Sequence, residues 1–426
     1  MLRRMIPAGF AIALAAAPGC GDPVPSAPPR AAVPAPAPVS SAPLPVDVEP
    51  LRAAPRRALW VLCEGSQRVL EHPERIDALL ADAARLGATD LFVQVYRGGR
   101  AWFDSSHADA GPHRAILAAH GRDTLTELLD RAHERGLRVH AWVNVLSLAG
   151  NRAAPIVQTL GPSAVQVDRS GRSLLDYPDF EVPEPDRRYY RMGTPALWLD
   201  PGAPGVAEHL AATFAELVER YPTLDGLHLD YIRYPDVLPF IPGSRFGVGL
   251  EFGFGEASRQ RFRAETGLEA PFGASAANAN RFDDWRREQV TGVVQGIRDA
   301  ARAKRAGVEL SAAVWAYPDR AYLSLFQDWR GWLEQDLLGF AVAMLYTLDD
   351  RLVHYNTRAF VGGVGGSRVW IGLGTWLFAN RPERATQQLR EAEAAGPAGI
   401  ALFSWDAIAD APALSAALAA EAGRGG

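Results

Sequence analysis

The alternation of two kinds of segment constrains the fold of this chain more than any other feature. From Ala58 onward, short apolar runs rich in Val, Leu and aromatic residues alternate with longer amphipathic stretches. This alternation predicts βαβ units and a parallel sheet. The predicted strands span residues 59–63, 90–96, 138–143, 226–231, 309–315, 339–346, 368–373 and 399–405. The predicted helices span residues 73–86, 123–135, 206–221, 282–305, 326–336 and 382–395.

Eight strands with intervening helices predict an α/β fold, the closed (β/α)8 TIM barrel. The alternative, an open doubly wound sheet, typically carries a glycine-rich phosphate turn after its first strand. The residues after the first predicted strand here, Glu64-Gly65-Ser66, do not form such a turn. Two long connections, 144–204 and 233–280, follow the third and fourth strands. Because barrel enzymes build their sites at this end of the strands, we expect both connections to shape a substrate groove.

The N-terminus has the pattern of an export signal. Arg3 and Arg4 precede an apolar stretch over 5–17, which ends in Pro18-Gly19-Cys20. This pattern predicts a signal peptide over 1–20 with a lipobox-like end, in which Cys20 becomes the lipidated residue; a cleaved signal with a free cysteine is the alternative. Residues 21–55 are rich in Pro, Ala and Ser, which predicts an extended linker. We therefore expect an exported catalytic barrel over 56–422 that is lipid-anchored to the cell envelope, at the outer membrane.

Composition narrows the range of partners. The net charge is −5, with 44 basic and 49 acidic residues, and the basic residues form no long run. Such a balance provides no field that would hold a polyanion, so nucleic acid is not an expected partner. The 11 Trp and 11 Tyr suit sugar binding, because pyranose rings stack on flat apolar rings, although most aromatic residues belong to a core. The expected partner is a polysaccharide or oligosaccharide, and no cofactor or metal is expected.

The fourth predicted strand carries the main candidate for chemistry. Side chains alternate across a strand, so Leu227 and Leu229 should face the helices while His228 and Asp230 face the barrel axis. Asp230 lies where the strand enters the long loop. A carboxylate there would be partly desolvated, which chains rarely tolerate without a partner or a role. Asp230 is therefore predicted to be catalytic, and a structural ion pair with Arg233 or His228 is the alternative.

Glycoside hydrolysis usually requires a second carboxylate. Asp349 and Asp350 after the sixth strand, Asp406 after the eighth and Glu64 after the first are candidates, of which we favour Asp349 and then Glu64. Other strand ends and the adjoining loops carry residues predicted to bind sugar hydroxyls and ring faces. These are Arg97, Trp142, Asn144, Tyr234, Trp315, Tyr346, Trp376, Trp405 and Asp406. The deeper His140 and Gln94 are predicted to be hydrogen-bonded filling of the barrel.

The run from Leu224 to Pro235, LDGLHLDYIRYP, resembles the signature of the glycosyl-hydrolase-like family 10 proteins. These are exported bacterial barrels that include lipoproteins acting on cell-wall glycan. The agreement covers roughly 57–420 and extends to 92–96, 139–144, 198–201, 285–289, 344–347 and 401–404. The resemblance implies a hydrolytic barrel with Asp230 as the central acid and with Asp200, His228, Arg233 and Tyr346 as site companions. The chain departs from better-known members at Glu64 and at Ala343-Met344.

Two other functions remain open. In a metal-dependent hydrolase, His228 and Asp230 would bind a cation with Asp200 or His140, and activity would then be lost to a strong chelator. In a non-catalytic glycan-binding lipoprotein, Asp230→Asn would leave the only activity, binding, intact. A substrate-assisted chitinase is excluded, because Ile232 stands where that mechanism requires its proton donor.

Overall fold

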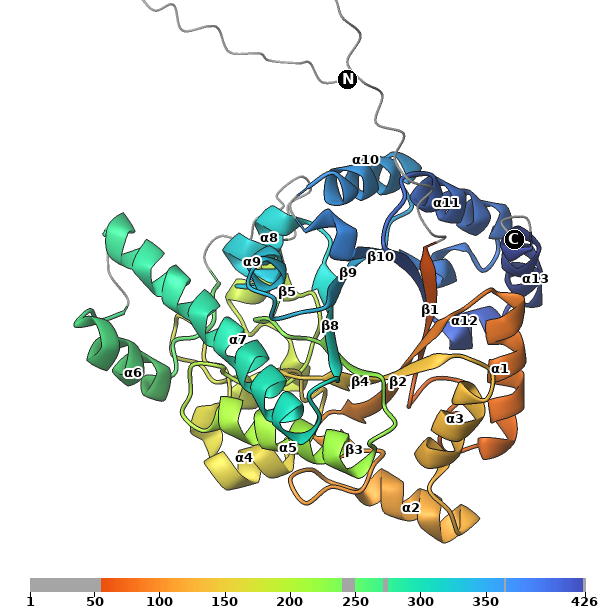
Figure 1. The fold of residues 1–426 in the computed structure, drawn as a ribbon. Helices are drawn as coiled ribbons and strands as arrows, with labels where there is room; N and C mark the ends of the chain where they lie inside the picture. The colour runs from red at the N-terminus through yellow and green to blue at the C-terminus, as the bar shows by residue number, and fades with distance from the viewer. Residues whose placement is uncertain (1–54, 240–249, 271–274, 364, 424–426) are drawn as a thin grey trace, which may run out of the picture. The chain divides into compact units, whose positions relative to one another are not determined.

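Eight parallel strands close into a barrel in the computed structural model of the protein, which describes residues 55–239, 250–270, 275–363 and 365–423 (Figure 1). The sheet runs in the order β1, β11, β10, β9, β8, β6, β4 and β2, and pairing of β1 with β2 closes it. This confirms the predicted TIM barrel. The eight strands are β1 (Arg56–Val61), β2 (Asp90–Arg97), β4 (Arg138–Asn144), β6 (Gly226–Asp230), β8 (Glu309–Trp315), β9 (Phe340–Leu345), β10 (Val369–Gly374) and β11 (Gly399–Phe403).

Helices form a ring around the strands (Figure 1). Those matching the predicted helices are α1 (Ile76–Arg85), α3 (Thr124–His133), α5 (Val206–Arg220), α7 (Ala276–Lys304), α9 (Trp329–Glu334) and α11 (Pro382–Ala394). Those not predicted are α2 (Gly111–His120), α4 (Pro155–Leu160), α6 (Glu256–Thr266), α8 (Pro318–Ser324), α10 (Asp350–Val361), α12 (Trp405–Ala409) and α13 (Pro412–Ala422). Four of these, α2, α4, α8 and α13, have a proline at their first or second position, a start signal that the sequence displays.

Capping side chains correct two predicted boundaries. Helix α7 begins at Ala276 rather than at residue 282, because the Ser275 side chain caps it by accepting a hydrogen bond from the Asn278 N–H. Strand β11 ends at Phe403 rather than at residue 405, because Ser404 caps α12 in the same way through the Ala407 N–H. Trp405 is therefore the first residue of a helix and leaves the strand's alternation.

Two apolar layers hold the barrel together. Outward-facing strand residues such as Leu227 and Leu229 pack against the helices in one large cluster. A second cluster fills the barrel interior and contains Ala58, Trp60, Phe92, Trp142, Ala313, Phe340, Val342, Trp370 and Ala401. Small residues make room for the rings, since a side chain at Gly399 would overlap the indole of Trp370. The interior is therefore a packed core rather than a channel.

The two long connections after β4 and β6 are joined to each other. The first contains α4 and β5 (Tyr190–Met192), and the second contains β7 (Val237–Pro239) and α6. Strands β5 and β7 pair antiparallel, and the Gly193 N–H donates to the Asp236 carbonyl at 2.9 Å. Both loops rise from the carboxyl ends of neighbouring strands, as the sequence predicts.

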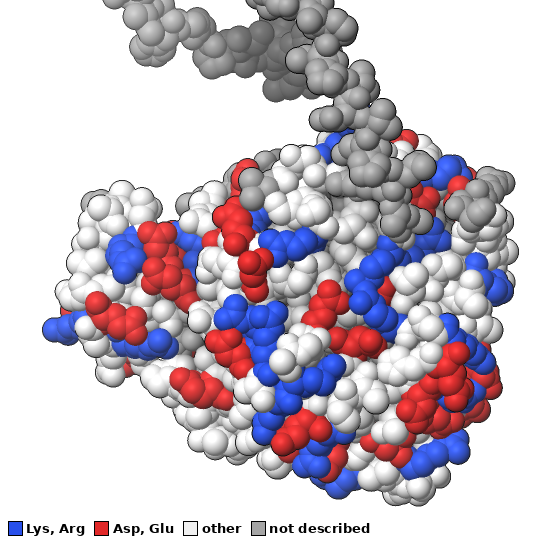
Figure 2. Space-filling model, viewed as in Figure 1, with Lys and Arg blue, Asp and Glu red and all other residues white. Residues whose placement is uncertain are grey.

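The predicted signal peptide, Cys20 and all but the last residue of the predicted linker lie outside the described residues. Within the described ranges, every helix is too short or too polar to cross a bilayer. Figure 2 shows acidic and basic side chains interspersed on the face viewed, without a large area of either sign.

The contact between Gly399 and Trp370 predicts the cost of one extra methyl group in the barrel interior. We expect Gly399→Ala to lower the free energy of unfolding by about 1–3 kcal/mol, because a new Cβ would displace the indole. Gly292→Ala is the matched control, since its Cβ on α7 would meet nothing within 4 Å and should raise stability by about 0.5–1 kcal/mol. Denaturant unfolding of both variants measures the difference, and equal stability of the two would contradict the packing described.

Candidate active site

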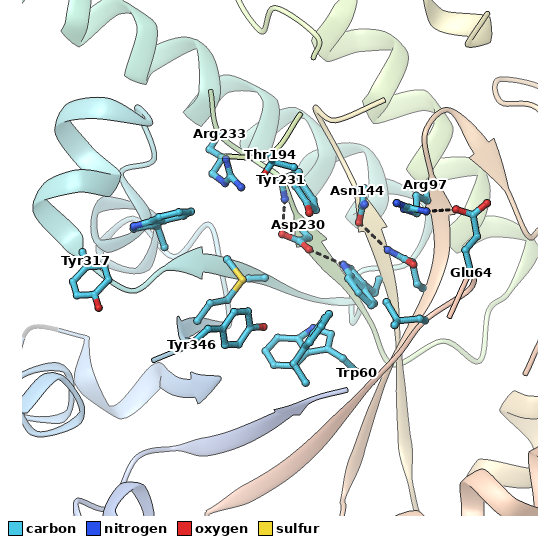
Figure 3. Close-up of a pocket in the computed structure, with 17 residues that line it drawn as sticks. Trp60, Glu64, Arg97, Asn144, Thr194, Asp230, Tyr231, Arg233, Tyr317 and Tyr346 are labelled. Atoms are coloured by element: carbon cyan, nitrogen blue, oxygen red, sulfur yellow. Dashed lines mark hydrogen bonds and ion pairs between the residues drawn. The ribbon is translucent and has the colours of Figure 1, made fainter. Parts of the chain in front are cut away.

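A cavity of about 490 Å³ opens at the carboxyl ends of the strands. Its wall contains the last residues of β2, β4, β6 and β8 and the loops that follow them, the position at which barrel enzymes place their chemistry. Figure 3 shows Asp230 in the middle of this wall, with Glu64 and Tyr317 on opposite sides of it. The lining residues are Trp60, Leu62, Glu64, Gln94, Arg97, Trp142, Asn144, Thr194, Asp230, Tyr231, Arg233, Ala313, Trp315, Tyr317, Met344, Tyr346 and Phe403.

Asp230 is the buried acid of this cavity. It is the last residue of β6, and only 7% of its surface is exposed. Its Oδ2 accepts a hydrogen bond from Trp142 Nε1 at 3.1 Å, and its Oδ1 accepts one from the Tyr231 N–H at 2.6 Å. Burial raises the pKa of Asp230 to about 6, although these donors and Arg233 act in the opposite direction. The carboxyl group is therefore held in one orientation and can carry a proton in mildly acidic solution.

The residues after Asp230 turn sharply toward the cavity. Tyr231 has a φ of 52°, a left-handed conformation that ends the strand and its alternation. Arg233 is 5% exposed and ion-paired with Asp236 at 3.2 Å. Its guanidinium lies over the rings of Trp198, Tyr231 and Trp315 at 5.0, 5.2 and 5.3 Å from their centroids. Arg233, which the sequence offered as an ion-pair partner for Asp230, is therefore held by the Asp236 carboxylate and by three aromatic rings.

Glu64 is the second carboxylate among the described residues that line the cavity. It follows β1 and forms ion pairs with Arg97 and Arg100, and Figure 3 shows the contact with Arg97. Arg97 ends β2, and Arg100 lies on β3 (Arg100–Ala101), which folds back antiparallel onto β2. Both arginines are thereby placed beside the Glu64 side chain, so Arg97 is a loop ion-pair partner as well as a cavity residue.

A chain of amide hydrogen bonds orients Asn144. Gln94 Oε1 accepts from the Cys63 N–H at 3.4 Å and from Cys63 Sγ at 3.1 Å. Gln94 Nε2 donates in turn to Asn144 Oδ1 at 3.2 Å. Because its oxygen is engaged, Asn144 has its amide N–H groups to offer to the cavity. Gln94 is hydrogen-bonded as predicted, yet it also lines the cavity.

The structure brings together eight of the residues selected from the sequence: Glu64, Arg97, Trp142, Asn144, Asp230, Arg233, Trp315 and Tyr346. His228 lies directly beneath them inside the barrel, stacked on Phe92 with 4.1 Å between ring centroids. Its Nε2 accepts from Trp60 Nε1 at 3.1 Å, and its Nδ1 contacts Ser311 Oγ at 2.9 Å. Burial lowers the pKa of His228 well below its usual value, so the ring is neutral inside the barrel, and it does not line the cavity.

Asp349, the favoured second carboxylate, lies outside the cavity lining. Its side chain is 47% exposed and caps α10 by accepting a hydrogen bond from the Arg351 N–H at 3.0 Å. Capping accounts for an Asp at this position without any role in chemistry. Asp350 pairs with Arg384 at 2.9 Å and likewise lies apart from the cavity.

Four further predicted site residues are buried away from the cavity. Asp406 accepts hydrogen bonds from the Leu62 and Gln67 N–H groups at 3.2 and 3.0 Å, and it holds the loop after β1. Trp405 packs toward α1 and donates from Nε1 to Asp82 at 2.9 Å. Asp200 accepts from Ser258 Oγ at 2.7 Å, and Tyr234 packs edge-on against Phe326 at 4.9 Å. These contacts fix loops and helices, and none of the four lines the cavity.

Trp376 is exposed beside the cavity and does not line it. It lies on the 3₁₀ turn Thr375–Phe378 that follows β10. Its ring meets that of Tyr346, a lining residue, at 4.8 Å between centroids and 82° between planes. Trp376 therefore stands at the rim.

Several lining residues were not selected from the sequence. Trp60 lies on β1, and Leu62 directly after β1 continues its inward alternation, so the rule that selected Asp230 could have identified both. Tyr231 reaches the cavity through its left-handed backbone, and Thr194 through the pairing of β5 with β7. Neither feature has a signal in the local sequence.

The predicted metal-binding alternative lacks its donor set. Both ring nitrogens of His228 are engaged, and His140 is bonded to Asp90 at 3.0 Å. Throughout the described ranges, no three His, Cys, Asp or Glu side chains converge in a way that could hold a metal ion. The residues named for that alternative therefore do not assemble a shell.

The barrel, with its buried acid in a cavity at the carboxyl ends of the strands, has the architecture that the sequence predicted for a glycoside-hydrolase-like barrel. Residues 55–351, more than half of the chain, match the family described as Glycosyl hydrolase-like 10, and the chain belongs to this family. The resemblance inferred from the fourth strand is thereby confirmed.

Among curated proteins, glycosyl hydrolase DigH of Escherichia coli K12 is 27% identical over 284 residues, which cover 62% of this chain and 55% of DigH. Glycosyl hydrolase YngK of Bacillus subtilis is 22% identical over 298 residues, covering 65% of this chain and 50% of YngK. The chain thus spans about half the length of these relatives.

Solved structures of low identity share the fold. The PgaB (BpsB) glycoside hydrolase domain of Bordetella bronchiseptica matches with a TM-score of 0.61 at 15% identity, covering 85% of this chain and 99% of that one. The β-galactosidase of Rahnella sp. R3 matches with a TM-score of 0.53 at 14% identity, covering 87% of this chain and 57% of that one.

The raised pKa of Asp230 predicts a pH-dependent difference in stability between the protein and its Asp230→Asn variant. A carboxyl whose folded pKa lies near 6, above its unfolded value of 3.8, is destabilised in its ionised form. Between these values the folded protein binds more protons, so the stability of the unchanged protein falls relative to the variant as pH rises. The full change is about 3 kcal/mol between pH 3 and pH 7.

Denaturant unfolding of both proteins at a series of pH values measures this difference. All other titrating groups are common to the two proteins and cancel in the comparison. A difference that does not vary with pH would show that the Asp230 carboxyl is not shifted by burial.

Proposed function

We propose that this barrel is a glycoside hydrolase that cleaves O-glycosidic bonds in a polysaccharide by acid/base catalysis with two carboxylates. The observation that carries the proposal is Asp230, a buried acid with a pKa near 6, oriented into a cavity of about 490 Å³. Membership of the Glycosyl hydrolase-like 10 family supports the class of reaction. The aromatic rings of Trp60, Trp315 and Tyr346 in the wall suit the apolar faces of sugars.

In this mechanism Asp230 is the general acid. Protonating the oxygen of the leaving sugar requires a carboxyl group that keeps its proton near the working pH, and burial supplies this property. Trp142 Nε1 and the Tyr231 N–H fix the carboxyl plane and stabilise the carboxylate that remains after the proton has left. Asp230 then recovers its proton from solvent.

We assign the second carboxylate role to Glu64, which lines the cavity, in place of Asp349, which caps a helix. Glu64 acts on the opposite side of the sugar from Asp230, where it activates the attacking water or attacks directly. Arg97 and Arg100 hold its carboxylate in place from β2 and β3.

We also propose that the protein is exported, anchored through Cys20 to the cell envelope, and acts on an envelope polysaccharide, with peptidoglycan glycan strands as the first candidate. The motif before Cys20, the Pro-rich linker and the family support this location and substrate.

Replacement of Asp230 separates an enzyme from a binding module. We expect Asp230→Asn to lower kcat by about 10²- to 10⁴-fold, because the general acid is lost while the cavity keeps its shape. Release of reducing ends from purified peptidoglycan glycan strands and other polysaccharides measures turnover, and calorimetry with the same glycans measures binding. Unchanged turnover in the variant, or no new reducing ends from any glycan with the unchanged protein, would reject the hydrolase.

The pH profile tests the direction of proton transfer. A general acid must be protonated, so we expect kcat/KM to fall as pH rises through about 6, the pKa of Asp230. Glu64→Gln should lower kcat while leaving this descending limb in place, because Asp230 is unchanged. If the limb instead ascends through pH 6, Asp230 acts as the base or nucleophile and the two roles must be exchanged.

Replacing the Cys20 thiol by a serine hydroxyl tests the proposed lipid anchor. In the full chain expressed in a Gram-negative host, Cys20→Ser should remove incorporated fatty acid and release the protein from the membrane fraction. Mass spectrometry of the N-terminal peptide reads the modification directly. Membrane association that survives the change would contradict anchoring through Cys20.

A further inference from the structure

Trp376 is more exposed to solvent than any other tryptophan of the chain. All eleven tryptophans lie in the described residues; nine are buried and Trp315 is partly buried, whereas 39% of the Trp376 surface is exposed. Exposing a large aromatic ring forgoes the stabilisation that its burial would provide. One exposed apolar residue is ordinary in itself, so the case for a role depends on how the ring is held and where it lies.

The backbone that carries Trp376 is fixed on both sides. Thr375 Oγ1 donates a hydrogen bond to the Phe403 carbonyl at 2.9 Å and so ties the turn to β11. Phe378, at the other end of the turn, is buried with 1% of its surface exposed. The turn is therefore anchored by its flanking residues, and Trp376 is presented from a rigid support.

The Trp376 ring packs against a glycine, Gly374, and two aromatic rings. A Cβ built on Gly374 would lie 2.5 Å from a carbon of the Trp376 six-membered ring, so the indole lies against the bare backbone of β10. The rings of Tyr346 and Phe403 meet it nearly edge-on, at 82° and 74°. Edge-on neighbours and a glycine beneath hold the indole in one place.

The packing site of the Trp376 indole adjoins the cavity. Tyr346 and Phe403, the two rings that Trp376 touches, both line the cavity that contains Asp230. A glycan that fills the cavity and continues past these rings would meet the Trp376 indole next. Flat apolar rings are the surfaces on which pyranoses stack their C–H faces.

From this geometry we infer that Trp376 forms a second sugar-binding subsite outside the cavity, which stacks one pyranose ring of a chain whose other sugars occupy the cavity. The inference rests on the proposed hydrolase function and adds to it a preference for long glycans. A sugar chain too short to pass Tyr346 gains nothing from the outer subsite, whereas a longer chain gains one stacking contact.

Chain length is the variable that tests the subsite. Calorimetric Kd values are measured in the Asp230→Asn background for β-1,4-linked N-acetylglucosamine oligomers of two and six sugars, which share the backbone linkage of peptidoglycan. Adding Trp376→Ala should weaken binding of the six-sugar oligomer about 5- to 10-fold and leave the two-sugar oligomer within about twofold. Trp376→Phe should restore part of the loss, because a smaller ring still stacks.

Gly374→Ala provides an independent test that keeps the tryptophan. Its new Cβ must displace the indole, so it should produce the same length-dependent loss. Tyr355→Ala, at a residue on α10 whose surface is 63% exposed, is the matched control and should change neither Kd. Thermal unfolding shows that each variant is folded, and the more conservative Trp376→Phe keeps the test available if Trp376→Ala does not fold.

Equal weakening of both oligomers by Trp376→Ala overturns the subsite, because Trp376 would then act only by supporting Tyr346. Unchanged binding, or no binding of the six-sugar oligomer by the parent, also overturns it. These measurements do not depend on turnover. Lack of hydrolysis by the unchanged protein therefore rejects the proposed enzyme without rejecting the subsite. Conversely, hydrolysis by the unchanged protein, together with a Trp376→Ala effect on Kd that does not depend on oligomer length, rejects the subsite without rejecting the enzyme.

Discussion

The site depends on a layer of aromatic rings that closes the barrel beneath it. Trp60, Phe92 and His228 come from three different strands and contact one another, with His228 stacked on Phe92 and bonded to Trp60. These rings belong to, or pack against, the apolar cluster that fills the barrel interior, and Trp142 of the same cluster donates a hydrogen bond to Asp230. The raised pKa of Asp230 therefore depends on burial in the barrel as much as on the residue itself.

The same burial opposes stability and supports the proposed chemistry. An ionised carboxylate with 7% exposure lowers the stability of the fold near neutral pH, and a chain selected for stability alone would replace it. The well-packed rings and the glycines that admit them offset this cost elsewhere in the barrel. The polar contacts in the cavity wall, including the Glu64 ion pairs and the hydrogen bond from Gln94 to Asn144, hold the surrounding groups in place.

The sequence predicted the barrel and the inward position of Asp230 at the end of β6, because strand alternation and helix periodicity are local signals. The same alternation placed His228 on the inner face but could not show that its nitrogens were occupied. Asp349 and Asp406 were selected as strand-end acids, and the structure uses them to cap a helix and to hold a loop. Thr194 was not found, since its position depends on pairing between loops that are distant in the sequence.

The pairing of β5 with β7 means that the two long loops cannot vary independently. Thr194 belongs to one loop and Arg233 to the other, and the joint between them is a short antiparallel ladder continued by Gly193 and Asp236. Shortening either loop would leave the ladder partner with unpaired backbone groups and would loosen the opposite wall of the cavity. Transfer of a new specificity into this barrel would therefore require both loops to be exchanged together, as one unit.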